Sequence, residues 1–195
     1  MELSDAIEKL KKHISNIYLS TGNKIGDNIY RGHLRTISTD IEDGIAIFIS
    51  DILPGEYKIF LDSSIHIGGK KNRPDLLVVD SNNNVKAMVE IKANMGWCRN
   101  ASMVIDDIIL SDIMFKTHKN LTCEFSREEN QKIFYGENVK LFLVAFTDNN
   151  SSLKNHVANK LYASKFDVFQ FNLFTGWYDS LSNCEIEEFG KELVM

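Results

Sequence analysis

Two acidic residues and a lysine interrupt an otherwise apolar pattern in the segment RPDLLVVDSNNNVKAMVEIKAN, residues 73–94. The pattern is typical of two apolar strands joined by a polar, asparagine-rich turn. Asp75 stands at the start of the first strand, and Glu90 and Lys92 stand near the end of the second. Carboxylates and lysines can bind metal ions, move protons and hold phosphates, so the relative positions of these three residues decide what chemistry the segment can do.

The spacing predicts that the two acidic side chains face each other. If the turn occupies residues 81–84 and Asp80 faces Val85, the residue numbers of every cross-strand pair add up to 165, and Asp75 faces Glu90. Their Cβ atoms would then lie about 5 Å apart. A slip of one residue would place the two side chains on opposite faces, so this register is a hypothesis that a structure can test.

Two facing carboxylates repel each other and need compensation. Lys92 lies two residues beyond Glu90, points to the same face and offsets one charge. A divalent ion would offset the rest, because Mg²⁺ (or Mn²⁺) prefers oxygen ligands such as Asp75, Glu90 and the backbone carbonyl of Ile91. Alternatively, one carboxylate is protonated or solvated. With a metal ion the group suits phosphodiester hydrolysis, in which Lys92 orients the attacking water or stabilises charge on phosphorus.

Pro74-Asp75, followed fifteen residues after the aspartate by Glu90-Ile91-Lys92, resembles the signature of the PD-(D/E)XK nuclease superfamily. The setting is similar too, since the first motif opens one strand of a hairpin and the second closes the other. The resemblance spans residues 40–147. It implies an α/β fold of the restriction endonuclease-like type, with an αβββαβ core and a mixed central sheet flanked by helices, here with an added N-terminal helix. It also implies a Mg²⁺-dependent endodeoxyribonuclease with Asp75, Glu90 and Lys92 as catalytic residues.

The first core helix of this superfamily often carries a further acidic residue that contributes to metal binding. Here the helix is expected at residues 40–53, and the resemblance therefore points to Glu42, or else to Asp43. Glu42 has a structural alternative, because Thr39 and Glu42 together match a capping box at the helix N-terminus.

Basic residues gather just before the first strand of the hairpin, at Lys70, Lys71 and Arg73. Beside a carboxylate site they would bind backbone phosphates, although a solvated turn is the alternative. Asn94 and Arg99 follow the second strand and are further candidates for contact with nucleic acid. Double-stranded DNA is the expected partner.

The remaining pattern predicts one nuclease-like domain over residues 1–195. Residues 1–38 are expected to add a helix and a loop to the core at 40–147, and residues 148–195 to add a C-terminal helix and strand. Helices are predicted at 4–19, 40–53, 102–116 and 151–163, and strands at 57–66, 74–80, 85–92, 140–147 and 166–173. Residues 20–37 and 121–138 are predicted to be irregular, and the acidic segment CEIEEFGKEL to be exposed.

Composition narrows the class of protein. The chain has 195 residues, 44% of them hydrophobic and 25% charged, which is ordinary for a globular domain. The net charge of −5 argues against a general nucleic-acid binder, but carboxylates that hold metal cations would add to the negative count. Three widely spaced cysteines without a metal-binding pattern favour a reducing compartment. No long apolar run is present, so a cytoplasmic protein without membrane contact is expected.

The leading hypothesis is a metal-dependent DNA endonuclease resembling a type II restriction enzyme. Small members of this branch generally act as homodimers, and the apolar helix at 102–116 and the aromatic strand at 166–173 offer a dimer face. Recognition would fall to residues 20–37 and 121–138. One alternative is a structure-specific repair, recombination or phage-type nuclease. Another is a catalytically silent interaction module on the same scaffold.

Overall fold

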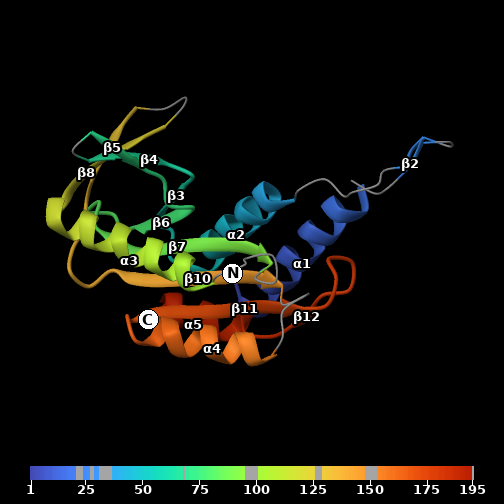
Figure 1. Ribbon diagram of the computed structural model, residues 1–195. Coiled ribbons are helices and arrows are strands. Elements are labelled where there is room, and N and C mark those ends of the chain that lie inside the picture. The colour runs from blue at the N-terminus through green and yellow to red at the C-terminus, as the bar shows by residue number, and fades with distance from the viewer. Residues whose placement is uncertain are drawn as a thin grey trace.

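The structure is a computed structural model that describes residues 1–20, 24–26, 29–30, 37–67, 69–94, 101–125, 129–147 and 153–194. Its centre is a mixed sheet of six strands with helices on both faces (Figure 1). The three inner strands β7, β10 and β11 run parallel, whereas β6, β3 and β12 pair antiparallel at the two sides. In sheet order the strands are β12 (Ser182–Asn183), β11 (Val168–Thr175), β10 (Lys140–Thr147), β7 (Val85–Asn94), β6 (Leu76–Val79) and β3 (Lys58–Leu61).

Two hydrophobic cores lie on the two faces of this sheet. The first is formed with α1 (Leu3–Ser20), α2 (Ser38–Ile52) and α5 (Ile186–Val194). The second is formed with α3 (Ala101–His118) and α4 (Leu153–Ser164). Strand β10 is buried along almost its whole length because it contributes side chains to both cores. Within the described residues, no helix combines the length and the apolar character needed to cross a membrane.

A second, four-stranded sheet extends the α3 side of the molecule. Its strand order is β5 (Lys70–Asn72), β4 (Ser64–Ile67), β8 (Asn120–Glu124) and β9 (Gln131–Phe134), and all pairs are antiparallel. The inward side chains of this sheet, among them Ile65, Cys123 and Ile133, join the second core. Figure 1 shows β4, β5 and β8 rising from the central sheet next to α3. A separate short pair joins β1 (Lys24–Gly26) to β2 (Ile29–Tyr30).

Four expectations about individual segments are wrong. The predicted strand at 57–66 is divided between β3 and β4, which belong to different sheets, because the backbone turns at Asp62 with φ of 50°. Segment 121–138 contains β8 and β9, and segment 20–37 contains β1 and β2. The acidic C-terminal segment forms most of α5, where Ile186 and Phe189 are fully buried although its glutamates face outward. The other predicted helices and strands are found, with their ends shifted by at most two residues.

The β6–β7 hairpin has the predicted register. Leu76 pairs with Val89, Leu77 with Met88 and Val78 with Ala87, and each pair sums to 165. Only the end next to the turn differs, because the register shifts after Val78 and Val79 pairs with Val85, so the connection spans residues 80–84 instead of 81–84. The pairs next to the acidic residues are therefore those that the sequence predicts.

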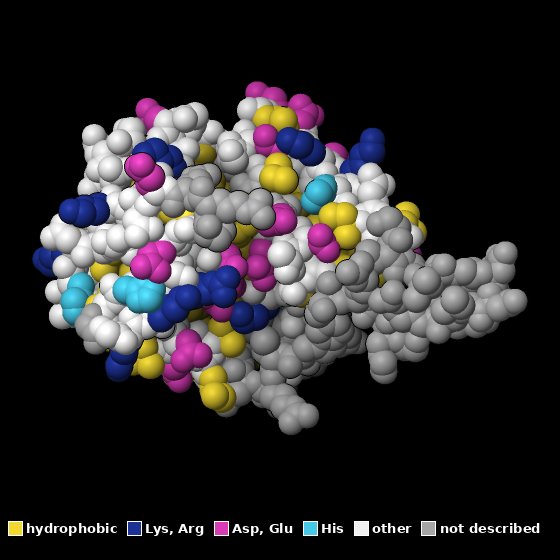
Figure 2. All heavy atoms as spheres, turned by 90° about the horizontal axis from the view of Figure 1, so that it is seen from above, with side chains coloured by type: hydrophobic (Ala, Val, Ile, Leu, Met, Phe, Trp, Pro, Cys, Tyr) yellow, Lys and Arg dark blue, Asp and Glu magenta, His cyan; other side chains and the backbone are white. Residues whose placement is uncertain are grey.

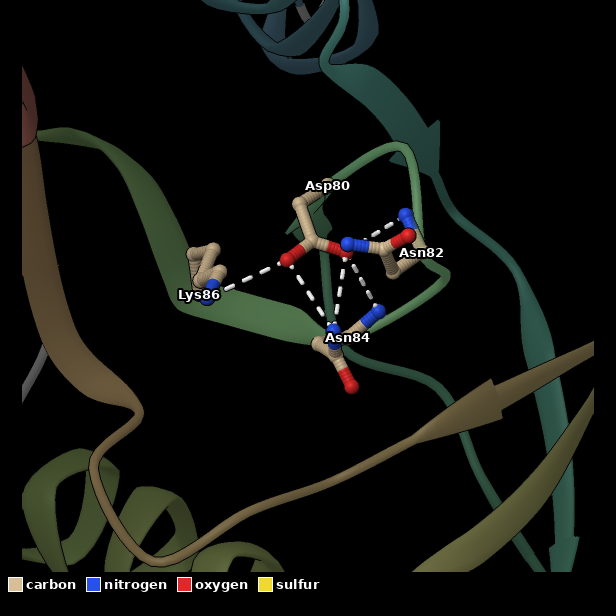
Figure 3. Close-up of polar contacts among 4 residues, drawn as sticks. All are labelled: Asp80, Asn82, Asn84 and Lys86. Atoms are coloured by element: carbon tan, nitrogen blue, oxygen red, sulfur yellow. Dashed lines mark hydrogen bonds and ion pairs between the residues drawn. The ribbon is translucent and has the colours of Figure 1, made fainter.

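Asp80 closes this turn with its side chain (Figure 3). One of its oxygens accepts hydrogen bonds from the backbone N–H groups of Asn82 and Asn84, at 2.9 and 2.8 Å. The Asn84 amide and the Lys86 ammonium, 3.1 Å from Oδ2, add to this network. Burial alone would raise the pKa of Asp80, but these hydrogen bonds outweigh it and lower the pKa to about 2. The ionised carboxylate thus fixes the turn that sets the register.

We expect Asp80→Ala to destabilise the fold by about 1–3 kcal/mol at pH 7, because two backbone donors lose their acceptor. The folded pKa lies below the unfolded value of 3.8, so this contribution is present above about pH 4 and is lost as the pH falls towards 2. Urea unfolding of wild type and variant across this pH range measures the difference. Lys86→Ala, which removes only a half-exposed ion pair, should cost less than about 1 kcal/mol. Equal midpoints for Asp80→Ala and wild type at pH 7 would contradict the role of this side chain.

Candidate active site

Asp75, Glu90 and Lys92 lie together on the face of the central sheet that α3 covers. The side chains of Leu77, Val79 and Met88 point into the core on that side, and Asp75, Glu90 and Lys92 continue the same alternation. The backbone of Asp75 also extends the sheet by one pair, since its carbonyl accepts a 2.8 Å hydrogen bond from the Asp62 N–H. The antiparallel register therefore brings the two acidic side chains to one place, as the sequence predicts.

Short contacts hold the three side chains in place. The Ile91 N–H donates to Asp75 Oδ2 at 2.6 Å, and Lys92 Nζ donates to Glu90 Oε1 at 2.6 Å. Lys92 Nζ lies 3.9 Å from Asp75 Oδ2, so a single ammonium faces both carboxylates. All three side chains are about three-quarters buried, with exposed fractions of 23% for Asp75, 26% for Glu90 and 27% for Lys92. The group is sheltered from water yet reachable from it.

Burial raises the pKa of both carboxyl groups. For Glu90 the negative charge of Asp75 adds to the increase, and Lys92 opposes it. For Asp75 the hydrogen bond from Ile91, the charge of Lys92 and a side-chain hydrogen bond with Glu90 act against burial, but the pKa stays above its usual value. Two adjacent carboxyl groups that are largely buried repel each other when both are ionised, so the free site favours one negative charge over two.

Glu42 lies near this pair, in the second turn of α2. Burial, followed by the charges of Asp75 and Asp62, raises the pKa of Glu42 to about 7. The predicted capping box is not formed, since Ile37 is the N-cap of α2 and no side chain caps the helix. The structural alternative for Glu42 is thereby removed, and its role as a metal ligand remains a prediction. Asp43, the second choice, is exposed.

Two further acidic residues lie close enough to act on the site through their charges, and no pattern in the sequence indicates this. Asp62, at the corner between β3 and β4, raises the pKa of both Glu42 and Asp75 through its charge. Asp107 on α3 acts on Glu90 in the same way. They come from different elements at large sequence separation, so only the tertiary fold brings them near the β6–β7 hairpin.

The donor chemistry of the site suits a hard divalent cation. Among the described residues, no three Asp, Glu, His or Cys side chains converge into a ready metal-binding group. Two adjacent carboxylates remain, both with a raised pKa and with one lysine between them, beside the backbone carbonyl of Ile91. A divalent ion at this position would offset the repulsion between the two carboxylates, and oxygen ligands are those that Mg²⁺ and Mn²⁺ prefer.

A hollow of about 250 Å³ opens beside Glu90 and is walled by β5, the segment after it and α3. Lys71 and Arg73 line it, as do Asp107 and Ser111. Lys70, Lys71 and Arg73 are all exposed, as expected for residues that contact a ligand. Asn94 is only 5% exposed, so its burial disfavours the predicted contact with nucleic acid. Arg99 lies outside the described residues, and so do Arg31, His33 and Arg35.

No family model matches the chain, and no curated protein matches it in sequence. Among solved structures, the chain is similar to that of NucC from P. aeruginosa ATCC27853 in its cAAA-bound form. The TM-score is 0.50 and the identity 14%, and the match covers 99% of this chain and 91% of that one. The fold is thus a mixed α/β fold with a mixed central sheet flanked by helices, similar to that of NucC, and the fold class expected from the sequence is confirmed.

We expect Glu42→Gln to raise the melting temperature by a few degrees at pH 8 in the presence of EDTA. The folded pKa of about 7 exceeds the ordinary value of 4.5, so the folded state favours the neutral acid. That preference is fully present below about pH 4.5 and is lost as the pH rises through 7, which leaves an unfavourable charge that the glutamine lacks. The gain should vanish near pH 4.5. Thermal unfolding at both pH values tests this, with Asp43→Asn at the neighbouring exposed position as control.

Proposed function

We propose that the protein is a metal-dependent endonuclease that hydrolyses phosphodiester bonds in double-stranded DNA. The observation that carries the proposal is the meeting of Asp75, Glu90 and Lys92 on one face of the sheet in a half-sheltered site. The likeness to NucC, a nuclease of the PD-(D/E)XK type, supports the same conclusion from the fold. The motif, the strands that carry it and the fold of this neighbour all support a nuclease.

The residues divide the chemistry between them. Asp75, Glu90 and the Ile91 carbonyl would hold a Mg²⁺ or Mn²⁺ ion, with Glu42 as a further ligand, and such an ion supplies charge stabilisation and lowers the pKa of bound water. The Ile91 N–H fixes the orientation of Asp75, because it donates to Oδ2. Lys92 Nζ is positioned to orient the attacking water and to stabilise negative charge on the phosphate oxygens. Its short contact with Glu90 holds the ammonium at that place.

The cations beside the site suit a phosphate backbone. Lys71 and Arg73 line the same hollow as Glu90, so a phosphate bound there would lie next to the carboxylates. The alternative of a silent interaction module is weakened by the cost of the acidic pair, since a buried repulsive pair is expensive to keep without a function. The alternative of a structure-specific nuclease uses the same chemistry on branched DNA.

Purified protein incubated with supercoiled plasmid and Mg²⁺ should nick or linearise it, and EDTA should abolish the reaction. We expect Asp75→Ala to lower the rate on the order of a thousandfold, about 4 kcal/mol of transition-state stabilisation, because it removes a metal ligand. Asp51→Ala, which breaks an ion pair with Lys9 on the α1–α2 side, is the matched control and should cut like wild type.

The products distinguish the candidate functions. Discrete bands that Asp75→Ala loses support cutting at defined sequences. Cutting of branched DNA alone supports the structure-specific alternative. If no nucleic acid is cut with Mg²⁺ or Mn²⁺, the proposed enzyme is wrong and the interaction module remains.

We further propose that the active form is a homodimer joined through α3 and α4. The two helices are neighbours, since the Tyr162 hydroxyl on α4 donates to Asp106 on α3. Several large apolar side chains on their outer surfaces are more than half exposed, namely Met103, Leu110, Ile113, Val157 and Leu161. A second copy on this surface would cover them, and two sites could then act on the two strands of DNA. The aromatic strand β11 offers less, because Phe174 is buried, Phe171 packs against the first core, and only Phe169 of its three phenylalanines is exposed.

We expect Leu110→Gln to shift sedimentation towards the monomer, since it places a polar group at the centre of the proposed interface. Analytical ultracentrifugation over a range of protein concentrations measures the change in dissociation constant. Leu19→Gln on α1, which alters a leucine that is 63% exposed elsewhere, is the control. A wild-type protein that remains monomeric at all concentrations would rule out this interface.

A further inference from the structure

A groove of about 770 Å³ lies in the angle between β3 and the four-stranded sheet. Strand β3 forms one side of it and is the edge strand of the central sheet, so no further strand of the described segments pairs with it there. The other side carries Ser64, Lys71 and Glu124, whose side chains share one face of the small sheet because their strands pair in that register. Of its lining residues, only Asp62, Lys71 and Arg73 also belong to the candidate active site described above.

The groove has uncompensated positive charge. Three cations and two acidic residues line it, and of the acidic residues Asp62 is paired with Arg73, while Glu124 contacts the His66 ring at 2.9 Å. Lys58 and Lys71 have no acidic partner among the described residues, and Lys58 Nζ contacts only the amide oxygen of Asn83, at 3.2 Å. Lys and Arg side chains form a cluster beside acidic ones in the middle of the face seen in Figure 2. The whole chain has a net charge of −5, but this groove is locally positive and can attract an anion.

The groove continues into the candidate active site. Lys71 and Arg73 line both the groove and the hollow next to Glu90, so they form the boundary that the two spaces share. Asp62 connects them on the other side, because its carboxylate binds Arg73 and its N–H donates to Asp75. A chain-like anion that crosses this boundary would pass from the carboxylates directly into the groove.

The distance from Lys58 to Asp62 along β3 determines how long such a ligand must be to contact both the active site and Lys58. Lys58 and Asp62 are four residues apart, and an extended strand rises about 3.3 Å per residue, so Lys58 lies about 13 Å from the corner beside the active site. One strand of B-form DNA advances about 3.4 Å per nucleotide, so this distance corresponds to about four nucleotides.

We propose that this groove binds the sugar-phosphate backbone of the DNA flank about four nucleotides from the bond that is cut, with Lys58 as its outermost contact. The inference rests on the proposed function and adds to it the place and the length of the substrate's flank. An extended peptide added to the edge of β3 is the competing occupant. The unpaired lysines and the continuity with the carboxylates favour the polyanion.

Binding of fluorescent duplexes, measured by anisotropy in Ca²⁺ with the Glu90→Gln protein, tests the inference. A second substitution, Lys58→Gln, removes the charge but keeps a polar group near Asn83. We expect it to weaken binding of a duplex of about 16 base pairs by about fivefold at 0.15 M salt, and to lower the salt slope by about 0.9, the effect of one lost phosphate contact. A hairpin with a stem of about four base pairs should bind equally to the Glu90→Gln protein with and without Lys58→Gln. Lys191→Gln on α5 is the matched control and should change neither value.

The outcomes separate this inference from the proposed function. If wild type cuts DNA but Lys58→Gln binds long and short duplexes like the Lys191→Gln control, the groove is not the binding site and the enzyme proposal stands. If Lys58→Gln selectively weakens the long duplex while no cleavage occurs with any metal, the groove binds DNA and the nuclease proposal fails. Binding that depends on length but not on salt would also overturn the inference, because it would exclude phosphate contacts.

Discussion

The paired register of β6 and β7 is the constraint on which the site depends. Like charges that face each other across two strands destabilise a sheet, yet Asp75 and Glu90 are held on one face. A slip of one residue by either strand would separate them, but it would also exchange the two apolar faces of that strand. If β6 slipped, Leu76 and Val78 would leave the α2 core for the α3 core and Leu77 would move the other way; if β7 slipped, Val89 and Met88 would exchange cores in the same manner. The burial of these apolar side chains thus outweighs the repulsion of two acids.

The protein's own groups compensate the negative charges of Asp75 and Glu90 only in part. Lys92 supplies one positive charge, and the Ile91 N–H supplies a hydrogen bond. Glu42, Asp62 and Asp107 add negative charge around them from three other elements. Burial then acts on a cluster that is already too negative, which is why the pKa of Glu42 rises to about 7. A site with this balance favours protonation, and in the proposed enzyme a divalent ion would compensate two carboxylates where a proton compensates one.

The sequence was sufficient for the features that are local or periodic. The hairpin register followed from a short turn and alternating apolar residues, and β10 from its uninterrupted apolar run. The sequence was insufficient for elements whose structure depends on contacts between residues far apart in the chain. Strands β8 and β9 are polar on one face and pair with each other and with β4, so their segment looked irregular. Helix α5 looked like an exposed acidic tail because only two of its large side chains, Ile186 and Phe189, fill the core. Asp62 and Asp107 could not be assigned because their neighbours are distant in the chain.

In the proposed enzyme, the residues for catalysis and those for substrate binding lie on different sheets. A cluster of carboxylates attracts metal ions but repels a phosphate backbone, so both needs cannot be met at the same point without cations nearby. The central sheet holds the acids, and the four-stranded sheet carries Lys70 and Lys71 on the strand that precedes Arg73. Arg73 lies at the junction, paired with Asp62. Because that pair joins the acidic and basic surfaces, a bound phosphate would compete with Asp62 for the guanidinium, and the approach of substrate would thereby alter the charge beside Asp75. The acidic balance of the whole chain is therefore compatible with a polyanionic substrate, since the attraction is confined to the surface next to the site.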